Sequence, residues 1–151
     1  MNETWSINVK SVLYGVQAVV PHMKERGHGQ MINVSSFLGR IPIVNARSVY
    51  SACKAAMNSL SAHLRGDLRE TGIVVTLVIP GMVATLFSAS ALHAPQETQE
   101  GPPGAQLQTA AEVAAVIIRT IEQPVPEIHT NPAHAVIVAK YYQDVAAFET
   151  G

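Results

Sequence analysis

The chain has 151 residues, of which 48% are hydrophobic and 14% are charged, and its formal net charge is −1. This length suits one domain with a hydrophobic core. The near-neutral charge provides no basic surface, so neither nucleic acid nor a membrane is expected as a partner. The single cysteine, Cys53, excludes an internal disulfide framework and is typical of a reducing compartment, so a cytoplasmic protein is expected.

The first predicted element is a long helix over residues 4–27. Its apolar residues nearly encircle the helix axis, which predicts burial on more than one side, by the chain's own sheet and by a second subunit. Gly27 or Gly29 is expected to end this helix. The glycine pair around His28 follows a helix and lacks a third glycine, so a helix end is favoured over a phosphate-binding turn.

A short apolar strand, "QMINVSS", is predicted next and stops at a pair of serines, Ser35 and Ser36. After a loop, a second helix is predicted from Ser48 to Glu70, with Gly72 closing it. The following segment, "IVVTLVIPG", is apolar on both faces, which predicts a parallel strand that is covered on both sides.

Residues 85–108 are too long for a plain connection and are predicted to form a substrate or lid loop. Thr109 and Glu112 have the spacing of a capping box, which predicts a third helix. A short third strand is expected within "VPEIHTN", and Asn131-Pro132 predicts the start of a last helix. The chain is therefore expected to be α/β, a single partial Rossmann-like domain over 1–151. Its doubly wound parallel sheet would have about three strands, with helices on both faces.

Two residues in the first turn of the 48–70 helix could carry acid–base chemistry. Tyr50 and Lys54 are four positions apart and share a helix face. A phenol, with a pKa near 10, is a poor proton donor and a poor base at neutral pH. A cation about 4–6 Å away at an effective dielectric near 20 stabilises the phenolate by roughly 3–4 kcal/mol, which favours general acid–base chemistry. A solvated surface pair with the same spacing is the alternative.

Four segments, in the right order and spacing, resemble those of the short-chain dehydrogenase/reductase family. "INVSSFLGR" looks like the strand and catalytic-serine segment of that family, and "YSACKAA" matches its Tyr-x-x-x-Lys helix. "IPGMVAT" is similar to the Pro-Gly-x-x-x-Thr turn that meets the nicotinamide end of the cofactor, and "WSINVKSVLYG" resembles the preceding helix with its asparagine. The resemblance covers most of the chain.

The resemblance implies that NAD or NADP is the cofactor and that an alcohol and a ketone are interconverted. Tyr50 would pass a proton to or from the reacting oxygen, and Lys54 would lower the pKa of Tyr50 and hold the ribose hydroxyls. Ser36 would hydrogen-bond the reacting oxygen, and Asn8 would help to hold a water linked to Lys54. The cofactor-binding residues implied are Tyr50, Lys54, Pro80, Gly81, Val83 and Thr85. A homo-oligomer built through the two long helices is also implied.

Ser35 competes with Ser36 for the catalytic role. Consecutive strand residues face opposite sides, so only one of the two can face Tyr50. The pattern Ser-x-x-Gly, which ends at Gly39, resembles the family better when Ser36 is the catalytic serine.

The sequence contains no glycine-rich turn after a strand and no residue about 20 positions further on to read the ribose. We therefore expect the chain to be the carboxyl-terminal, catalytic half of such an enzyme, a fragment that is inactive alone. The first strand would then be an exposed parallel edge, which predicts self-association or dependence on a partner.

Two other functions remain open at this point. The chain could be a non-catalytic remnant that acts as an oligomerisation or interaction module. A nucleotide-sugar epimerase also resembles the Tyr-x-x-x-Lys arrangement, but its serine and Pro-Gly segments fit less well. The histidines form no i, i+4 pair and no cluster with Cys53, so no metal site is expected and surface or loop positions are favoured for all six: His22, His28, His63, His93, His129 and His134.

Overall fold

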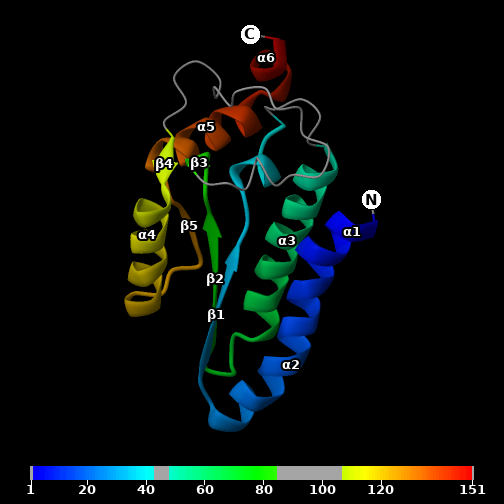
Figure 1. Cartoon of the computed structure of the whole chain (residues 1–151), viewed down its shortest axis with the longest axis vertical. Helices are drawn as coiled ribbons and strands as arrows, with labels where there is room; N and C mark the ends of the chain where they lie inside the picture. Colours follow the sequence, from blue (N-terminus) through cyan, green and yellow to red (C-terminus); the bar gives the residue numbers. More distant parts are fainter. Residues whose placement is uncertain (1, 43–47, 85–106, 151) are drawn as a thin grey trace.

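The computed structural model describes residues 2–42, 48–84 and 107–150. Within them, a three-stranded parallel sheet lies between helices on its two faces (Figure 1). The strand order is β1 (Gly29–Val34), β2 (Ile73–Ile79) and β5 (Glu127–His129). This arrangement confirms the predicted α/β fold with a Rossmann-like parallel sheet.

The helices form the outer layers of the molecule. A continuous helical segment begins with α1 (Asn2–Trp5), passes through a π-helical turn (Ser6–Lys10) and continues as α2 (Ser11–Arg26). Figure 1 shows α2 and α3 (Ser48–Asp67) on one side of the sheet and α4 (Ala110–Glu122) on the other. Two further helices, α5 (Pro132–Gln143) and α6 (Val145–Thr150), lie near the carboxyl ends of the strands.

The two faces of the sheet follow the two-residue period of its strands. Ile73 and Val75 pack against Leu64 of α3 and against Leu68, which follows the helix, so these alternate residues of β2 face that side of the sheet. Residues of the opposite parity face the other layer, and the side-chain amide of Gln30 in β1 donates to the carbonyl of Thr120 in α4 at 2.7 Å.

Several predicted helix ends are confirmed, but α3 ends at Asp67, before the predicted Glu70. Gly27 is left-handed, with φ 73°, and ends α2, while Thr109 and Glu112 form the expected capping box at the start of α4. The single last helix was wrong, because the chain is extended at Asp144 (φ −153°, ψ 92°) and separates α5 from α6. The Asp144 carboxylate accepts the amide of Ala147 at 2.9 Å, which caps the new helix.

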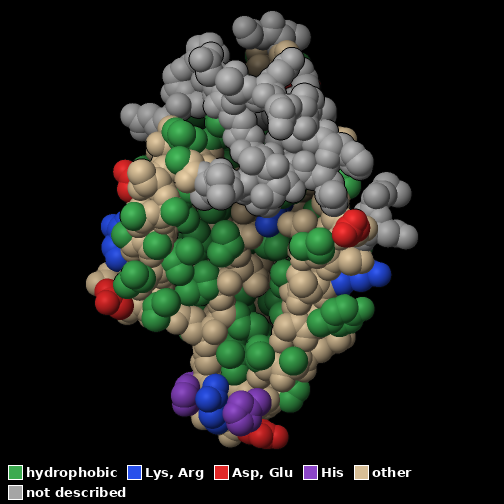
Figure 2. Space-filling view, viewed as in Figure 1, with side chains coloured by type: hydrophobic (Ala, Val, Ile, Leu, Met, Phe, Trp, Pro, Cys, Tyr) green, Lys and Arg blue, Asp and Glu red, His purple; other side chains and the backbone are tan. Residues whose placement is uncertain are grey.

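Apolar side chains remain exposed on several parts of the surface, including the sheet and the first helical segment. Within the described residues, β1 pairs with β2 alone and forms an edge of the sheet. Figure 2 shows apolar side chains gathered over these strands and the helix faces beside them; Val34 and Val74 are 41% and 39% exposed. On the first helical segment, Ile7 and Tyr14 are also exposed, so this chain covers only part of the nearly all-apolar helix. In the part of the chain that the structure describes, no helix has both the length and the hydrophobicity to cross a membrane.

Candidate active site

The carboxyl ends of β1 and β2 bring two of the predicted segments together. The amide of Ser35 donates to the carbonyl of Val78 and the amide of Phe37 donates to the carbonyl of Pro80, both at 2.8 Å. The serine segment therefore lies beside the Pro80-Gly81 turn. In α/β sheets, this edge is the one at which ligands bind.

Tyr50 and Lys54 lie together on the first two turns of α3. The Lys54 ammonium is 5.6 Å from the centre of the Tyr50 ring, and Lys54 is only 9% exposed. The ammonium donates to the carbonyl of Val34, the last residue of β1, at 3.1 Å. Burial lowers the pKa of Lys54 from its ordinary value, and the neighbouring Cys53 opposes that shift. Helix and strand thus hold a desolvated cation next to the tyrosine.

The two serines have different surroundings. Ser35 is buried, and its hydroxyl donates to the side chain of Asn58 at 2.5 Å, with the carbonyl of Lys54 at 3.3 Å. Ser36 is partly exposed and caps a short 3₁₀ turn (Phe37–Gly39), where its oxygen accepts the amide of Leu38 at 3.2 Å. The Ser35 hydroxyl is therefore bonded inside the protein, whereas the Ser36 side chain is partly exposed.

Asn8 lies in the π-helical turn, which packs against α3. Its side-chain nitrogen donates to the carbonyl of Thr4 at 3.0 Å, and its side-chain oxygen can accept a separate hydrogen bond. Turns with π-helical hydrogen bonding are often found at functional sites. The structure thus brings the helical turn of Asn8 against the helix that carries Tyr50 and Lys54.

Beyond Pro80 and Gly81, Val83 is partly buried in a two-residue strand, β3 (Val83–Ala84), which pairs in parallel with β4 (Gln108–Thr109). Thr85 and most of the predicted loop over 85–108 lie outside the described residues. Five of the six predicted cofactor-binding residues are therefore placed, and four of these lie at the carboxyl edge or on the first turns of α3.

Two histidines lie beside this edge, contrary to the surface or loop positions expected for them. The His134 ring stacks on Phe37, with ring centres 4.2 Å apart, and a Cβ built on Gly81 would lie 2.0 Å from its Cε1 atom. The His129 ring meets Phe37 edge-on at 6.5 Å. Burial lowers the pKa of both imidazoles, which favours their neutral forms. The residue spacing gave no signal of these contacts, because Phe37, on which both rings pack, is far away in the sequence.

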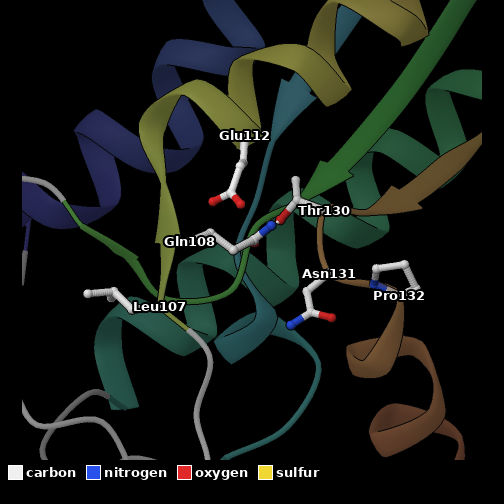
Figure 3. A pocket seen from close by; sticks show the side chains of 6 residues that line it. All are labelled: Leu107, Gln108, Glu112, Thr130, Asn131 and Pro132. Carbon is white, nitrogen blue, oxygen red and sulfur yellow. Dashed lines mark hydrogen bonds between the residues drawn. The ribbon is translucent and has the colours of Figure 1, made fainter.

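A cavity of about 500 Å³ lies beside the start of α4 and the start of α5 (Figure 3). Gln108 and Thr130 face one another across it and are hydrogen-bonded at 2.5 Å, and Glu112 points toward them from the first turn of α4. The remaining lining residues are Leu107, Asn131 and Pro132. None of the predicted catalytic residues lines this cavity, so the candidate active site is the strand edge around Tyr50 and Lys54.

A parallel sheet between helices, with polar groups gathered at its carboxyl edge, defines a Rossmann-like α/β protein. A family model described as short chain dehydrogenase matches residues 1–96, and the chain belongs to the short-chain dehydrogenase/reductase family. An uncharacterized oxidoreductase of Staphylococcus aureus (strain MW2), MW2403, is 32% identical over 130 residues, which are 83% of this chain and 52% of that protein. The chain thus spans about half the length of this relative.

Solved structures show the same fold. A short-chain dehydrogenase/reductase from Burkholderia phymatum in complex with NAD superposes with a TM-score of 0.77 and 24% identity, over 93% of this chain and 57% of that chain. A short-chain dehydrogenase from Burkholderia cenocepacia J2315 in complex with NADP gives a TM-score of 0.76 and 22% identity, over 97% and 56% of the two chains. At these identities the similarity extends to the fold alone.

Proposed function

We propose that this chain carries the catalytic residues of an NAD- or NADP-dependent oxidoreductase that interconverts an alcohol and a ketone. The observation that carries the proposal is the desolvated Lys54 ammonium, held by Val34 next to the Tyr50 ring at the strand edge that bears Ser36. Family membership and NAD- and NADP-bound neighbours of the same fold support this proposal.

The residues at this edge fit the nicotinamide and ribose end of such a cofactor. A lysine ammonium has three donors, so the bond to Val34 does not exhaust Lys54, and the others could hold ribose hydroxyls. Tyr50 would share that contact, and the turn from Pro80 through Val83 to Thr85 would lie along the carboxamide. The cofactor would supply or accept the hydride.

In the proposed reaction, the phenol of Tyr50 donates a proton to the carbonyl oxygen of a ketone, or its phenolate accepts one from an alcohol. Ser36 donates a hydrogen bond to the same oxygen and orients it. The buried cation of Lys54 would stabilise the phenolate that forms when Tyr50 gives up its proton. Asn8 holds a water through which protons reach Lys54 from solvent.

The test is a Tyr50→Phe substitution in a protein translated from the same gene with its upstream codons included. Upstream codons for a strand and a glycine-rich turn are expected, together with reduction of NAD or NADP by secondary alcohols. Tyr50→Phe should lower turnover at least about 100-fold, because the proton donor is lost, and should leave cofactor affinity nearly unchanged. Turnover retained by Tyr50→Phe would remove Tyr50 from the mechanism, and we expect no turnover from the 151-residue chain alone.

A second function, that of an interaction module, is favoured by the exposed apolar residues Ile7, Leu13 and Tyr14 on the first helical segment. This segment and α3 would form the interface of a homo-oligomer. Upstream codons that encode no glycine-rich half would favour this function over the enzyme.

A further inference from the structure

A line of buried polar residues runs along the face of α3 that meets β1. Lys54, Asn58 and Ser61 are spaced i, i+4, i+7 and therefore share one helix face, and they are 9%, 7% and 0% exposed. Each is hydrogen-bonded to β1 or to the residues that follow it. The bond farthest along α3 from Lys54 joins the side-chain amide of Asn33 to the hydroxyl of Ser61 at 2.9 Å. Buried polar side chains are retained at low cost only when they are paired, as these are.

Asn58, at the centre of this line, uses both ends of its carboxamide. Its oxygen accepts the Ser35 hydroxyl at 2.5 Å, and its nitrogen donates to the carbonyl of Gly39 at 2.9 Å. Ser35 precedes Ser36 in the chain and Gly39 ends the 3₁₀ turn that Ser36 caps. One side chain therefore holds the serine segment on both sides of Ser36.

The serine segment lies directly on α3. A Cβ built on Gly39 would lie 2.8 Å from the carbonyl carbon of Lys54 and 3.0 Å from the amide nitrogen of Asn58. The Ser35 hydroxyl also lies 3.3 Å from the carbonyl of Lys54. The bonds of Asn58 thus fasten the segment that carries Ser36 to the helical turn that carries Lys54. Figure 1 shows α3 alongside β1 over this region.

We propose that Asn58 is a positioning residue, which fixes the Ser36 hydroxyl and the Lys54 ammonium relative to one another. The proposal rests on the proposed function for its catalytic consequence, because Asn58 acts through Ser35 and Gly39 and not on the substrate. Groups held in place by buried hydrogen bonds need no reorganisation when the substrate binds.

The test compares Asn58→Ala with Ser61→Ala in the 151-residue chain carrying ¹³C-labelled lysine. Both variants lose a buried bond to the β1 segment on the same helix face, but Ser61 is about two helical turns away from Lys54. The ε-carbon signal of Lys54, assigned with a Lys54→Arg variant, reports its titration. We expect Asn58→Ala to raise the pH at which Lys54 titrates, because the loosened ammonium gains solvent, and Ser61→Ala to leave it unchanged.

An unchanged Lys54 titration in Asn58→Ala, or an equal change in Ser61→Ala, would overturn the proposal. Should Asn58→Ala fail to fold, Ser35→Ala decides the question. It removes one bond of Asn58 and keeps the bond to Gly39, so a smaller change in the same direction is expected. No change in Ser35→Ala would then contradict the positioning role.

The catalytic consequence is measured in the longer, cofactor-binding protein. We expect Asn58→Ala to lower kcat about 10- to 100-fold, since small displacements of reacting groups have effects of this size, with KM for the cofactor within about twofold. Loss of turnover in Tyr50→Phe with an unchanged kcat in Asn58→Ala would contradict the inference alone. Full turnover in Tyr50→Phe, with the Lys54 titration still altered by Asn58→Ala, would contradict the proposed function and leave the positioning role of Asn58 standing.

Discussion

His134 connects the amino-terminal turn of α5 to the candidate site. Its ring stacks on Phe37 and lies over Gly81, and its Nδ1 atom is buried with no hydrogen-bond partner among the described residues. The groups that act on the neighbouring His129 are Glu127, Arg40 and His134 itself, and Arg40 also forms an ion pair with Glu127. The positive charge that a proton would add to either imidazole would therefore be only partly offset by the groups around it.

Stability should fall on acidification because these histidines are neutral in the folded chain. Burial lowers their pKa below the ordinary 6.5, so the unfolded chain binds more protons as the pH falls through 6.5. The stabilisation that comes from keeping these histidines neutral is therefore present above pH 6.5 and is lost as the pH falls below it. We expect His134→Leu to reduce the slope of unfolding free energy against pH between pH 7 and 5, measured by urea denaturation.

The control for this experiment is His28→Gln, because His28 is exposed at the turn between α2 and β1. Its slope should match that of the unmodified chain. The same slope in His134→Leu as in the unmodified chain would show that His134 does not contribute to the acid sensitivity.

At the scale of elements, the sequence predicted the three strands of the main sheet and several helix ends because their signals are local, whereas the two-residue strands β3 and β4 were not predicted. Hydrophobic period, the capping box of Thr109 and Glu112, and the glycine at position 27 each act within a few residues. The break at Asp144 was missed because the apolar pattern continues on both sides of it. The contacts of His134 and Asn58 depend on chain segments far apart, although the i, i+4, i+7 spacing of Lys54, Asn58 and Ser61 was visible in the sequence.

The junction between α3 and β2 depends on Gly72. Its φ is +72°, and a Cβ at this position would lie 2.0 Å from the carbonyl oxygen of Gly27, at the end of α2. Gly72→Ala should therefore lower the free energy of unfolding by more than the roughly 1–2 kcal/mol that a left-handed residue costs, because the two helix ends must also separate. Chemical denaturation measures the effect.

Gly66→Ala is the matched control for Gly72→Ala. Gly66 lies in α3 with nothing within 4 Å of an added Cβ, so this substitution should stabilise the chain by about 0.5–1 kcal/mol. Equal effects of the two substitutions would contradict the role assigned to the Gly72 backbone.

At the scale of the whole molecule, two of the apolar surfaces that have no cover within the described residues adjoin the exposed sheet edge. One lies over the exposed sheet around Val34 and Val74, and the other lies on the first helical segment around Leu13 and Tyr14. Both adjoin a sheet whose edge strand, β1, has no strand on its outer side in the described part of the chain. These surfaces are typical of a chain that binds a further segment or a second copy.

We expect the purified chain to self-associate, with a mass above that of a monomer in light scattering after size exclusion. Val74→Lys should lower the associated fraction if the sheet face is used, because it places a charge in that apolar surface, and Tyr14→Lys should do so if the helix face is used. Val136→Lys, on α5, is the control and should have no effect. A monodisperse monomer that melts cooperatively would contradict this prediction.

The short parallel pair of β3 and β4 has a consequence for how such proteins diverge. Val83 is in register with Gln108, and Ala84 with Thr109, so these two pairs of residues lie side by side although they are far apart in the sequence. The ladder therefore fixes Ala84 next to Thr109, so a difference in length between these two positions in a relative would leave the strand edge that carries Ser36 and Lys54 unchanged.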